Sequence, residues 1–391
     1  MRGLTDSGEF RLVAVTDGGF PSGEATEIER LLRRGWWRVH IRKPGEPAAA
    51  VADLVGKIPA ELRPRLSLHD HFELAGQLGV GGVHLNFRNP EPPAGWQGMV
   101  SWSCHSLNEV EYHRGKADYM FLSPIFDSIS KPGYQSRFTP EELAASRLLG
   151  PDVFALGGVT PSNLPRLRGL GFGGGAMLSA AWEPLADPEK SRLQFITDRP
   201  DGVEEVLRGG CRWVQLRMKD ATDEEFAAAG LAVGRLCRKY RATFILDDRV
   251  HLVAPLNADG VHIGKNDMPV AEARRVLGPV KIIGATANTP ADALAAAEAG
   301  ADYLGVGPFR FTTTKKALAP LLGAEGIARV VEAVRNAGSR VPIVAIGGIE
   351  LPDLPEIRAT GVTGTAVSGL IRNSSDKTLT TKEILTIWKN L

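Results

Sequence analysis

The chain repeats itself at a distance of about 180 residues, and this repeat constrains its fold more than any other feature. Within two aligned stretches of 22 residues, Asp70 corresponds to Asp248 and His84 to His262. The offset between the copies is 178 residues there and grows to 190 residues at the Gly-Gly pair near the end of each copy. Such drift is typical of two homologous domains with loop insertions, whereas solenoid repeats have periods of about 20–50 residues. The chain therefore contains two related domains.

Each copy is long enough to form its own hydrophobic core. The chain has 391 residues, of which 43% are hydrophobic and 23% charged, as is ordinary for a globular protein. At a usual size of about 150 residues per domain, the length agrees with the repeat. A polar segment with two prolines, 183–192, is expected to link the copies. We predict a first domain at 8–184, a second at 192–372 and a tail at 373–391 that either forms a helix or frays.

Short apolar runs alternate with amphipathic helical patterns in both copies. Strands that are apolar on both faces are typical of a parallel sheet covered by helices. Eight of them in each copy predict an α/β fold with two tandem (β/α)8 TIM barrels. A flavodoxin-like doubly wound sheet is the rival, but polar motifs at the C-terminal end of nearly every run favour the barrel. The runs are 10–16, 36–42, 65–69, 82–85, 99–103, 118–123, 152–157 and 173–178, then 193–197, 213–217, 243–247, 259–263, 281–285, 302–306, 342–346 and 363–367.

Charge and cysteine usage narrow the class of protein. The net charge of +1 provides no overall field for nucleic acid or an anionic membrane, so we expect small-molecule partners. There is no signal-peptide pattern at the N-terminus and no run of 18 apolar residues, which indicates a soluble, cytoplasmic protein. The sequence leaves open whether the chain forms a homo-oligomer. The cysteines have no metal-like spacing and are expected to be free thiols: Cys104, Cys211 and Cys237.

The second copy carries polar side chains where its strands end, which is where TIM barrels place their active sites. Alternation along the second strand points Gln215, Arg217 and Lys219 to one face. Three donors on one face suit a diphosphate, and the alternative is a set of solvated charges. Asp248 at the third strand end and Asp267 after the fourth could hold Mg²⁺, although helix N-caps use aspartate equally well.

A second phosphate site is predicted at the ends of the last three strands. The loop after the sixth strand contains Thr312, Thr314 and Lys315, which suit phosphate oxygens, and the alternative is a polar surface loop. Glycines at 347–348 and 364–369 let backbone amides approach a phosphate. Two anion sites across one barrel mouth indicate a transfer between two phosphorylated molecules.

Taken in order over about 192–372, these motifs closely resemble the thiamine phosphate synthase family. They are QLRMK, the DD pair, GVHIGKND, GPFRFTTTKK, AIGGI and GTAVSGLI. The resemblance implies Mg²⁺-dependent coupling of a hydroxymethylpyrimidine diphosphate with a thiazole phosphate or its carboxylate, with release of pyrophosphate. It assigns the diphosphate to Gln215, Arg217 and Lys219, and Mg²⁺ to Asp248 and Asp267. It assigns the thiazole phosphate to Thr286, Thr312, Thr314, Gly348 and Ser368, and the departing pyrophosphate to Lys315.

The second copy departs from the family pattern at four positions. Asp247, beside the metal ligands in the substrate site, replaces the usual Asn, and Lys265 replaces the usual Gln. Arg310 and Phe311 replace a Phe-Pro pair in the loop after the sixth strand. We interpret these changes as tolerated variation.

The first copy keeps only part of this set. It retains Arg42, Asp70, Lys131 and Gly158. It has His40, Pro44 and Asn89 where the second copy has Gln215, Lys219 and Asp267. The loss of one metal carboxylate and one diphosphate ligand predicts that the first barrel is no synthase.

The first copy resembles thiazole tautomerase, a relative of the synthase, although the family's histidine falls at Pro124. Six of the eight histidines lie in this copy, and His40, His69 and His105 are expected at or near strand ends, where an imidazole could shuttle a proton. His84 is expected to be structural. The alternatives are a silent scaffold and a regulatory binding barrel. A zinc site is not expected, because the histidine spacings match no metal motif.

Two other functions compete for the whole chain. A barrel isomerase that handles phosphates is disfavoured, because it does not need the combined diphosphate and metal groups. A non-catalytic binding protein would bind the thiazole phosphate and form no product.

Overall fold

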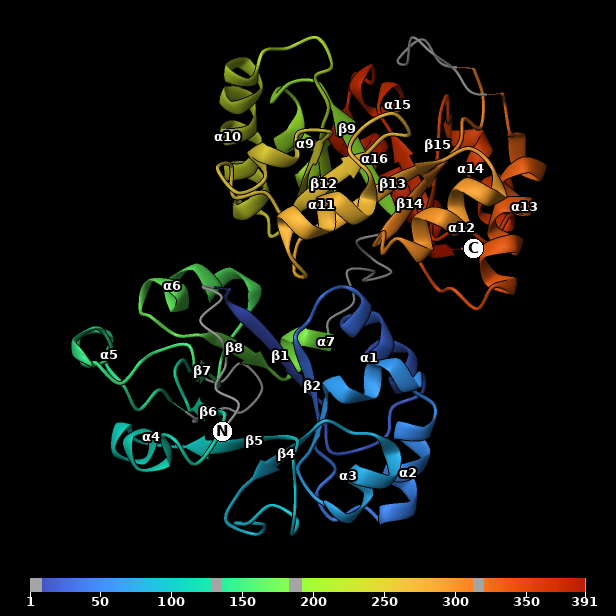
Figure 1. Ribbon diagram of the computed structural model, residues 1–391. Helices are drawn as coiled ribbons and strands as arrows, with labels where there is room; N and C mark the ends of the chain where they lie inside the picture. The colour runs from blue at the N-terminus through green and yellow to red at the C-terminus, as the bar shows by residue number, and fades with distance from the viewer. Residues whose placement is uncertain (1–8, 128–134, 183–191, 312–319, 391) are drawn as a thin grey trace. The chain divides into compact units, whose positions relative to one another are not determined.

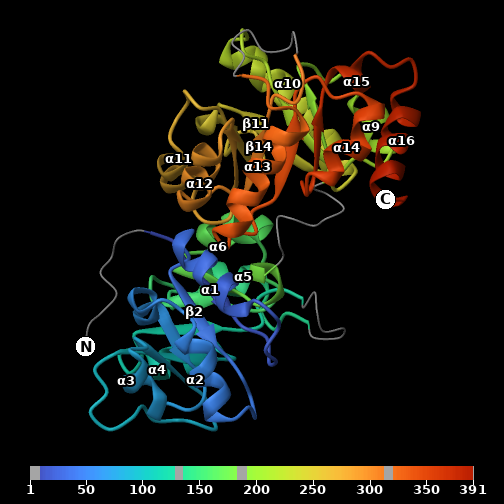
Figure 2. The ribbon, with the colours of Figure 1, turned by 90° about the vertical axis from the view of Figure 1, so that its right-hand side faces the viewer.

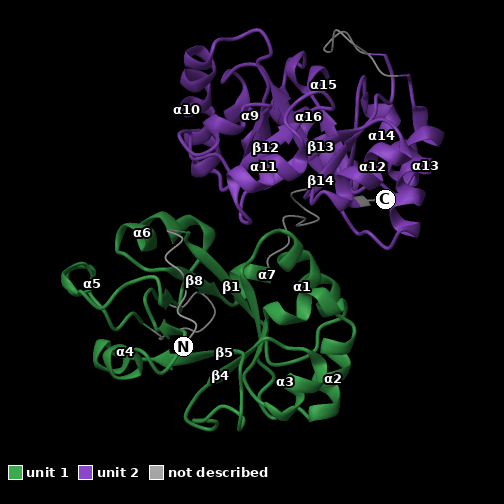
Figure 3. Cartoon of the chain, in the orientation of Figure 1, with its two compact units in different colours: residues 1–183 green, residues 184–391 purple. Residues whose placement is uncertain are grey.

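The chain folds into two compact units, residues 1–183 and 184–391 (Figure 3). The computed structural model describes residues 9–127, 135–182, 192–311 and 320–390. Each unit contains a closed barrel of eight parallel strands. The prediction of two tandem (β/α)8 barrels is thereby confirmed. Over the described ranges, the structure contains no helix that is both long and apolar enough to cross a membrane.

The first barrel orders its strands β1 to β8 as they occur in the sequence, and short helices connect them (Figure 1). Its strands are β1 (Arg11–Val15), β2 (Arg38–Ile41), β3 (Leu66–Leu68), β4 (Gly82–Leu85), β5 (Met99–Cys104), β6 (Tyr119–Leu122), β7 (Val153–Ala155) and β8 (Gly174–Met177). Its helices are α1 (Glu24–Arg33), α2 (Ala48–Gly56), α3 (Glu73–Leu78), α4 (Leu107–His113), α5 (Pro140–Ala145), α6 (Leu164–Gly169) and α7 (Ser179–Trp182), with 3₁₀ turns at Ala60–Arg65 and Pro161–Asn163.

The second barrel closes through the pairing of its first and last strands, β9 and β16. Its strands are β9 (Leu193–Thr197), β10 (Trp213–Leu216), β11 (Thr243–Asp247), β12 (Gly260–Ile263), β13 (Ile282–Ala287), β14 (Tyr303–Val306), β15 (Ile343–Ile346) and β16 (Gly364–Val367). Its helices are α9 (Val203–Arg208), α10 (Asp223–Lys239), α11 (Val270–Leu277), α12 (Pro290–Glu298), α13 (Gly323–Asn336), α14 (Leu354–Ala359), α15 (Gly369–Arg372) and α16 (Lys377–Asn390), with 3₁₀ turns at Val250–Leu252 and Leu351–Asp353.

Helices surround the strands of each barrel, so that the strands are buried on both faces (Figures 1 and 2). Outward side chains pack under the helices, and inward side chains fill the barrel. One tyrosine lies inside each barrel: Tyr119 in the first and Tyr303 in the second. Gly284 makes room for the second ring, because a Cβ at that position would lie 2.1 Å from a carbon of Tyr303. The interior is therefore filled by side chains, and only its C-terminal end can receive a substrate.

Two long helices of the second unit, α10 and α16, are stabilised in different ways. Helix α10 begins with a capping box in which Thr222 and Glu225 each accept from the other's backbone amide. The tail segment forms helix α16, which packs against α9 and α14 and buries Ile384 and Trp388. The end of the chain is thus part of the packed second unit.

Candidate active site

A cluster of carboxylates around one lysine lies at the C-terminal ends of β10, β11 and β12. We call Lys219, Asp247, Asp248 and Asp267 the acidic cluster. The Nζ atom of Lys219 lies 3.1 Å from Oδ2 of Asp247 and 4.0 Å from Oδ2 of Asp267, and its closest contact is with Asp248. Three strand ends that are separate in the sequence thus meet at one point. The structure brings together the residues that the motifs singled out for diphosphate and metal.

Asp247 is the buried member of the acidic cluster, with 5% of its surface exposed. Gln215 Nε2 donates to its Oδ1 at 3.3 Å, and Arg217 Nε lies 3.4 Å from its Oδ2. Burial raises the pKa of Asp247, and the charges of Lys219 and Arg217 partly oppose this rise. The carboxylate therefore holds the three side chains that point toward the mouth of the barrel.

Asp248 and Asp267 present oxygens that could bind a divalent cation. The backbone of Asp248 is left-handed, with φ of 64°, a conformation that is uncommon for a residue other than glycine. Within the described ranges its buried Oδ1 has no hydrogen-bond partner. A Cβ added at Gly264 would lie 2.5 Å from Asp267 Oδ2 and 4.0 Å from Asp248 Oδ1, so both oxygens face the same glycine. An unpartnered buried oxygen beside a second carboxylate fits Mg²⁺, which prefers oxygen ligands.

The predicted second phosphate site is partly described. Gly347 and Gly348 follow β15 with φ of 104° and 61°. A Cβ at Gly348 would lie 2.6 Å from the carbonyl oxygen of Phe311, so only glycine allows this close approach. Ser368 directly precedes helix α15. Thr312, Thr314 and Lys315 lie outside the described residues.

A buried polar network below the acidic cluster was not predicted. Tyr303 Oη accepts from Gln194 Nε2 at 3.1 Å and lies 3.0 Å from His262 Nδ1. The other nitrogen of His262 lies 3.0 Å from the hydroxyl of Thr286. Burial raises the pKa of Tyr303, so its hydroxyl stays protonated. Thr286, predicted in the substrate site, is thus oriented from below by a histidine. The inward alternation of β12 and β14 is the only sequence signal that could have indicated this network.

Lys265 and Arg310, two residues that differ from the family pattern, form ion pairs outside the acidic cluster. Lys265 Nζ lies 2.9 Å from a carboxylate oxygen of Asp292, at the start of α12. Arg310 lies 2.6 Å from Asp353 and 3.4 Å from Glu350. These charges are balanced by partners of the same unit.

In the first barrel, most of the positions that correspond to the acidic cluster hold other residue types. Asp70 lies 3.3 Å from Arg88 and accepts from Asn89 Nδ2 at 3.1 Å. Asp70 is thus paired with an arginine and with Asn89, the counterpart of Asp267, whereas Asp248 in the second barrel contacts Lys219. Arg42 is half-buried after β2. Gly158 has φ of 63°, close to the 61° of its counterpart Gly348, and Lys131 lies outside the described residues.

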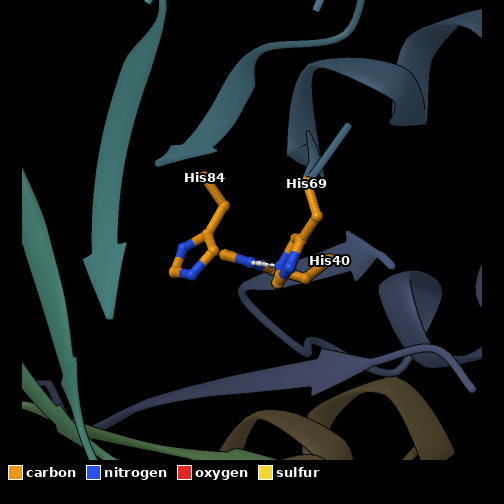
Figure 4. A group of neighbouring side chains, drawn as sticks. All are labelled: His40, His69 and His84. Atoms are coloured by element: carbon orange, nitrogen blue, oxygen red, sulfur yellow. Dashed lines mark hydrogen bonds between the residues drawn. The ribbon is translucent and has the colours of Figure 1, made fainter. Parts of the chain in front are cut away.

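The histidines of the first barrel lie deeper than predicted. His40 is fully buried inside the barrel on β2, and it is bonded on both nitrogens, to His69 Nε2 at 2.9 Å and Tyr119 Oη at 2.6 Å. His69 and His84 stack with ring centroids 4.1 Å apart. The ligand nitrogens of these three residues all lie within 4.8 Å of one another, so the spacing argument against a metal-type cluster is wrong (Figure 4). His105 alone is exposed, with Nδ1 3.2 Å from the carbonyl oxygen of Ser123.

Comparison with known proteins agrees with the repeat. The family Thiamine monophosphate synthase matches the chain twice, at residues 12–181 and 190–371. The chain belongs to the thiamine monophosphate synthase family. The thiamine-phosphate synthase of Phocaeicola vulgatus is 51% identical over 201 residues, which cover 50% of this chain and 97% of that protein. The thiamine-phosphate synthase of Pyrococcus abyssi is 39% identical over 201 residues, covering 50% of this chain and 94% of that protein.

A thiamine phosphate pyrophosphorylase from Pyrococcus furiosus is similar in structure. It is 36% identical, covers 52% of this chain and 97% of its own, and has a TM-score of 0.47. Each single-domain relative is thus about half as long as this chain. The chain is an enzyme of the thiamine monophosphate synthase family with a role in thiamine biosynthesis, and it contains the family's domain twice.

Proposed function

We propose that the second barrel couples a hydroxymethylpyrimidine diphosphate with a thiazole phosphate, or its carboxylate, and releases pyrophosphate. The observation that carries this proposal is the acidic cluster, in which Lys219 lies among Asp247, Asp248 and Asp267 at three strand ends. The corresponding residues of the first barrel are Pro44, His69, Asp70 and Asn89, and the described part of that barrel contains no such cluster there. We therefore assign the synthase reaction to the second copy alone.

Asp248 and Asp267 are the residues that would hold Mg²⁺. Their oxygens face one glycine, and one of them has no donor within the described residues. When bound there, Mg²⁺ supplies positive charge to the diphosphate leaving group. Lys219 contacts Asp248 and lies 4.0 Å from Asp267, so its positive charge acts at the same place.

The donors beside the metal ligands are suited to the diphosphate. Lys219 keeps 38% of its side chain exposed and Arg217 21%, so both can reach a ligand in the barrel mouth. Gln215 is held by Asp247 and fixes the depth at which a ligand can enter. Positive charge at fixed positions stabilises the negative charge that grows on the departing pyrophosphate.

The reaction breaks the bond between the pyrimidine methylene carbon and the diphosphate oxygen. The electron pair leaves with pyrophosphate, and the ring nitrogen of the thiazole donates the pair that forms the new carbon–nitrogen bond. With the carboxylate form, the bond from the ring carbon to the carboxylate also breaks, CO₂ leaves, and the ring carbon takes up a proton from water. No proton has to be removed at the reacting nitrogen, so no general base is required. This chemistry agrees with an acidic cluster that contains no histidine.

The thiazole phosphate is assigned to the opposite side of the mouth. Gly348 and Ser368 offer close backbone approach there, and Thr286 lies at the end of β13. Thr312 and Thr314 complete the proposed set, with Lys315 on the departing pyrophosphate. The support for these three is the motif that contains them.

The first barrel is proposed to bind a thiazole phosphate and to tautomerise its carboxylate form. The support is the Gly157–Gly158 pair with its left-handed backbone and an exposed His105 beside Ser123. Supplying the unaromatised tautomer alone tests this role, and His105→Ala is expected to slow its conversion. Unchanged conversion in that variant would refute the role of His105, and no conversion by the native protein would assign the first barrel to the silent alternative.

The synthase proposal is tested by incubating the protein with both phosphorylated substrates and Mg²⁺ and measuring thiamine phosphate. Lys219→Ala is expected to lower the rate by at least about a hundredfold, because a charged donor to the leaving group is lost. A rate within about twofold of the native protein would show that the assignment of the site is wrong.

A further inference from the structure

Three histidines from consecutive strands meet inside the first barrel (Figure 4). His40 lies on β2, His69 directly after β3 and His84 on β4. Their exposed fractions are 0%, 8% and 1%. The only exposed edge belongs to His69, at the C-terminal end of β3, which places the group just below the mouth of its barrel. We call these residues the histidine cluster.

The histidine cluster occupies the same positions as polar residues of the second barrel. His40 pairs in register with Ser67, and His69 lies two residues beyond that partner. In the second barrel, Gln215 pairs with Ile245, and Asp247 lies two residues beyond.

The third histidine is common to both barrels. Asp247 pairs with His262, and the one-residue step from Leu68↔Val83 brings His69 opposite His84. The first barrel has therefore replaced both the glutamine and the aspartate of this layer by histidine, around a histidine that both barrels contain.

We propose that the histidine cluster binds a divalent transition-metal ion, with zinc the best match. Imidazole nitrogen is a preferred zinc ligand, at distances of about 2.0–2.1 Å. Tetrahedral coordination at that distance separates ligand nitrogens by about 3.4 Å. The nitrogens of His40 and His69 are 2.9 Å apart, and all candidate nitrogens lie within 4.8 Å of one another. Rotation of the imidazole rings that moves their nitrogens by about 1.5 Å or less would therefore form the site.

Hydroxyl groups around the histidine cluster supply the outer contacts that zinc ligands usually have. Tyr119 Oη lies 2.6 Å from Nε2 of His40. Ser101 and Ser103 on β5 lie 2.8 Å from the two nitrogens of His84. His40 and His84 can therefore each turn one nitrogen to a metal and keep a partner for the other.

Burial also favours metal binding over protonation. It lowers the pKa of all three histidines, that of His84 to about 3, so the rings are neutral and their lone pairs are free of protons at neutral pH. The positive charges of Arg38, near His40, and of Arg42 and Arg88, near His69, oppose a further cation. We therefore expect zinc to bind more weakly than in a site that contains carboxylate or thiolate ligands.

The test measures zinc in the full chain, produced without a polyhistidine tag. The protein is incubated with excess zinc in a buffer that contains Mg²⁺, dialysed against metal-free buffer and analysed by mass spectrometry for metal content. We expect about one zinc per chain. Substitution with Co²⁺ should give the visible absorption of a low-coordinate nitrogen site. A native protein that retains no zinc and shows no such absorption overturns the proposal.

Variants locate the ion. His40→Gln introduces the residue of the second barrel and should abolish zinc retention, and His69→Asn should do the same. His105→Ala removes an exposed histidine, and Asp248→Asn removes a carboxylate of the acidic cluster; both should retain zinc. Retention by the first two, or loss in either control, overturns the assignment. If the first two fail to fold, the cobalt spectrum of the native chain still decides, because carboxylate ligands give a weaker, octahedral-type absorption.

Discussion

The histidine cluster should make the first barrel sensitive to acid. Burial lowers the pKa of His84 from its ordinary 6.5 to about 3, and it lowers those of His40 and His69 in the same direction. A folded-state pKa below the unfolded value means that the unfolded chain takes up the proton first. The stability that a neutral buried histidine contributes is fully present above its pKa in the unfolded chain. It is lost as the pH falls toward its pKa in the folded protein. Between about pH 6.5 and 5, His84 lowers the free energy of unfolding by about 1.4 kcal/mol per pH unit as the pH falls.

For His84 alone, the free energy of unfolding should fall by about 2 kcal/mol between about pH 7.5 and pH 5. Urea unfolding at several pH values, in the presence of a chelator, measures this loss. Tryptophan fluorescence reports mainly on the first unit, because five of the seven tryptophans lie there and only Trp213 and Trp388 in the second.

The matched variant His84→Gln removes the titrating ring and leaves every carboxylate in place. Its loss of stability over the same pH range should be smaller than that of the native protein by about 2 kcal/mol. His105→Gln, at an exposed position, should behave as the native protein does. Equal losses in the native protein and in His84→Gln would refute the reasoning.

Three further predictions concern the second unit. Gly338→Ala should lower the free energy of unfolding of this unit by about 1 kcal/mol, and Gly348→Ala should lower it by clearly more. Both glycines have positive φ, but only Gly348 lies close to a backbone carbonyl. Urea midpoints compare the two variants. Asp247→Asn should raise the free energy of unfolding at neutral pH, and this gain should vanish toward about pH 4. The pKa of Asp247 is raised in the folded state, so ionisation of its carboxyl group lowers the stability of the native protein as the pH rises. Ile384→Ala on α16 should cost about 3 kcal/mol, whereas Leu379→Ala, which is 51% exposed, should change the unfolding free energy by less than about 0.5 kcal/mol.

Much of the fold could be predicted from the sequence because parallel barrel strands have a strong signal. The run predicted at 193–197 is β9 (Leu193–Thr197), and the run predicted at 243–247 is β11 (Thr243–Asp247). Both faces of such strands are buried, so they appear as short apolar runs between helical periods. The repeat supplied each signal twice.

The acidic cluster could be predicted in outline because its residues follow strand ends, which meet at one edge of a barrel. The ion pair between Lys265 and Asp292 could not be predicted from the sequence, because it depends on how α12 packs. The depth of His40 was also missed. The expectation of histidines at the barrel mouth followed strand ends, whereas His40 lies on β2 and points inward with the alternation of that strand.

The central claim is that the synthase chemistry belongs to the second barrel and not to the first. Asp248 and Asp70 are corresponding carboxylates of the two copies, and their substitution by asparagine is the most direct comparison. Thiamine phosphate formation from both phosphorylated substrates with Mg²⁺ should fall by at least about a hundredfold in Asp248→Asn, because a charged metal ligand is lost. It should stay within about twofold of the native rate in Asp70→Asn. Equal rates in the two variants, or a greater loss in Asp70→Asn, would contradict this account.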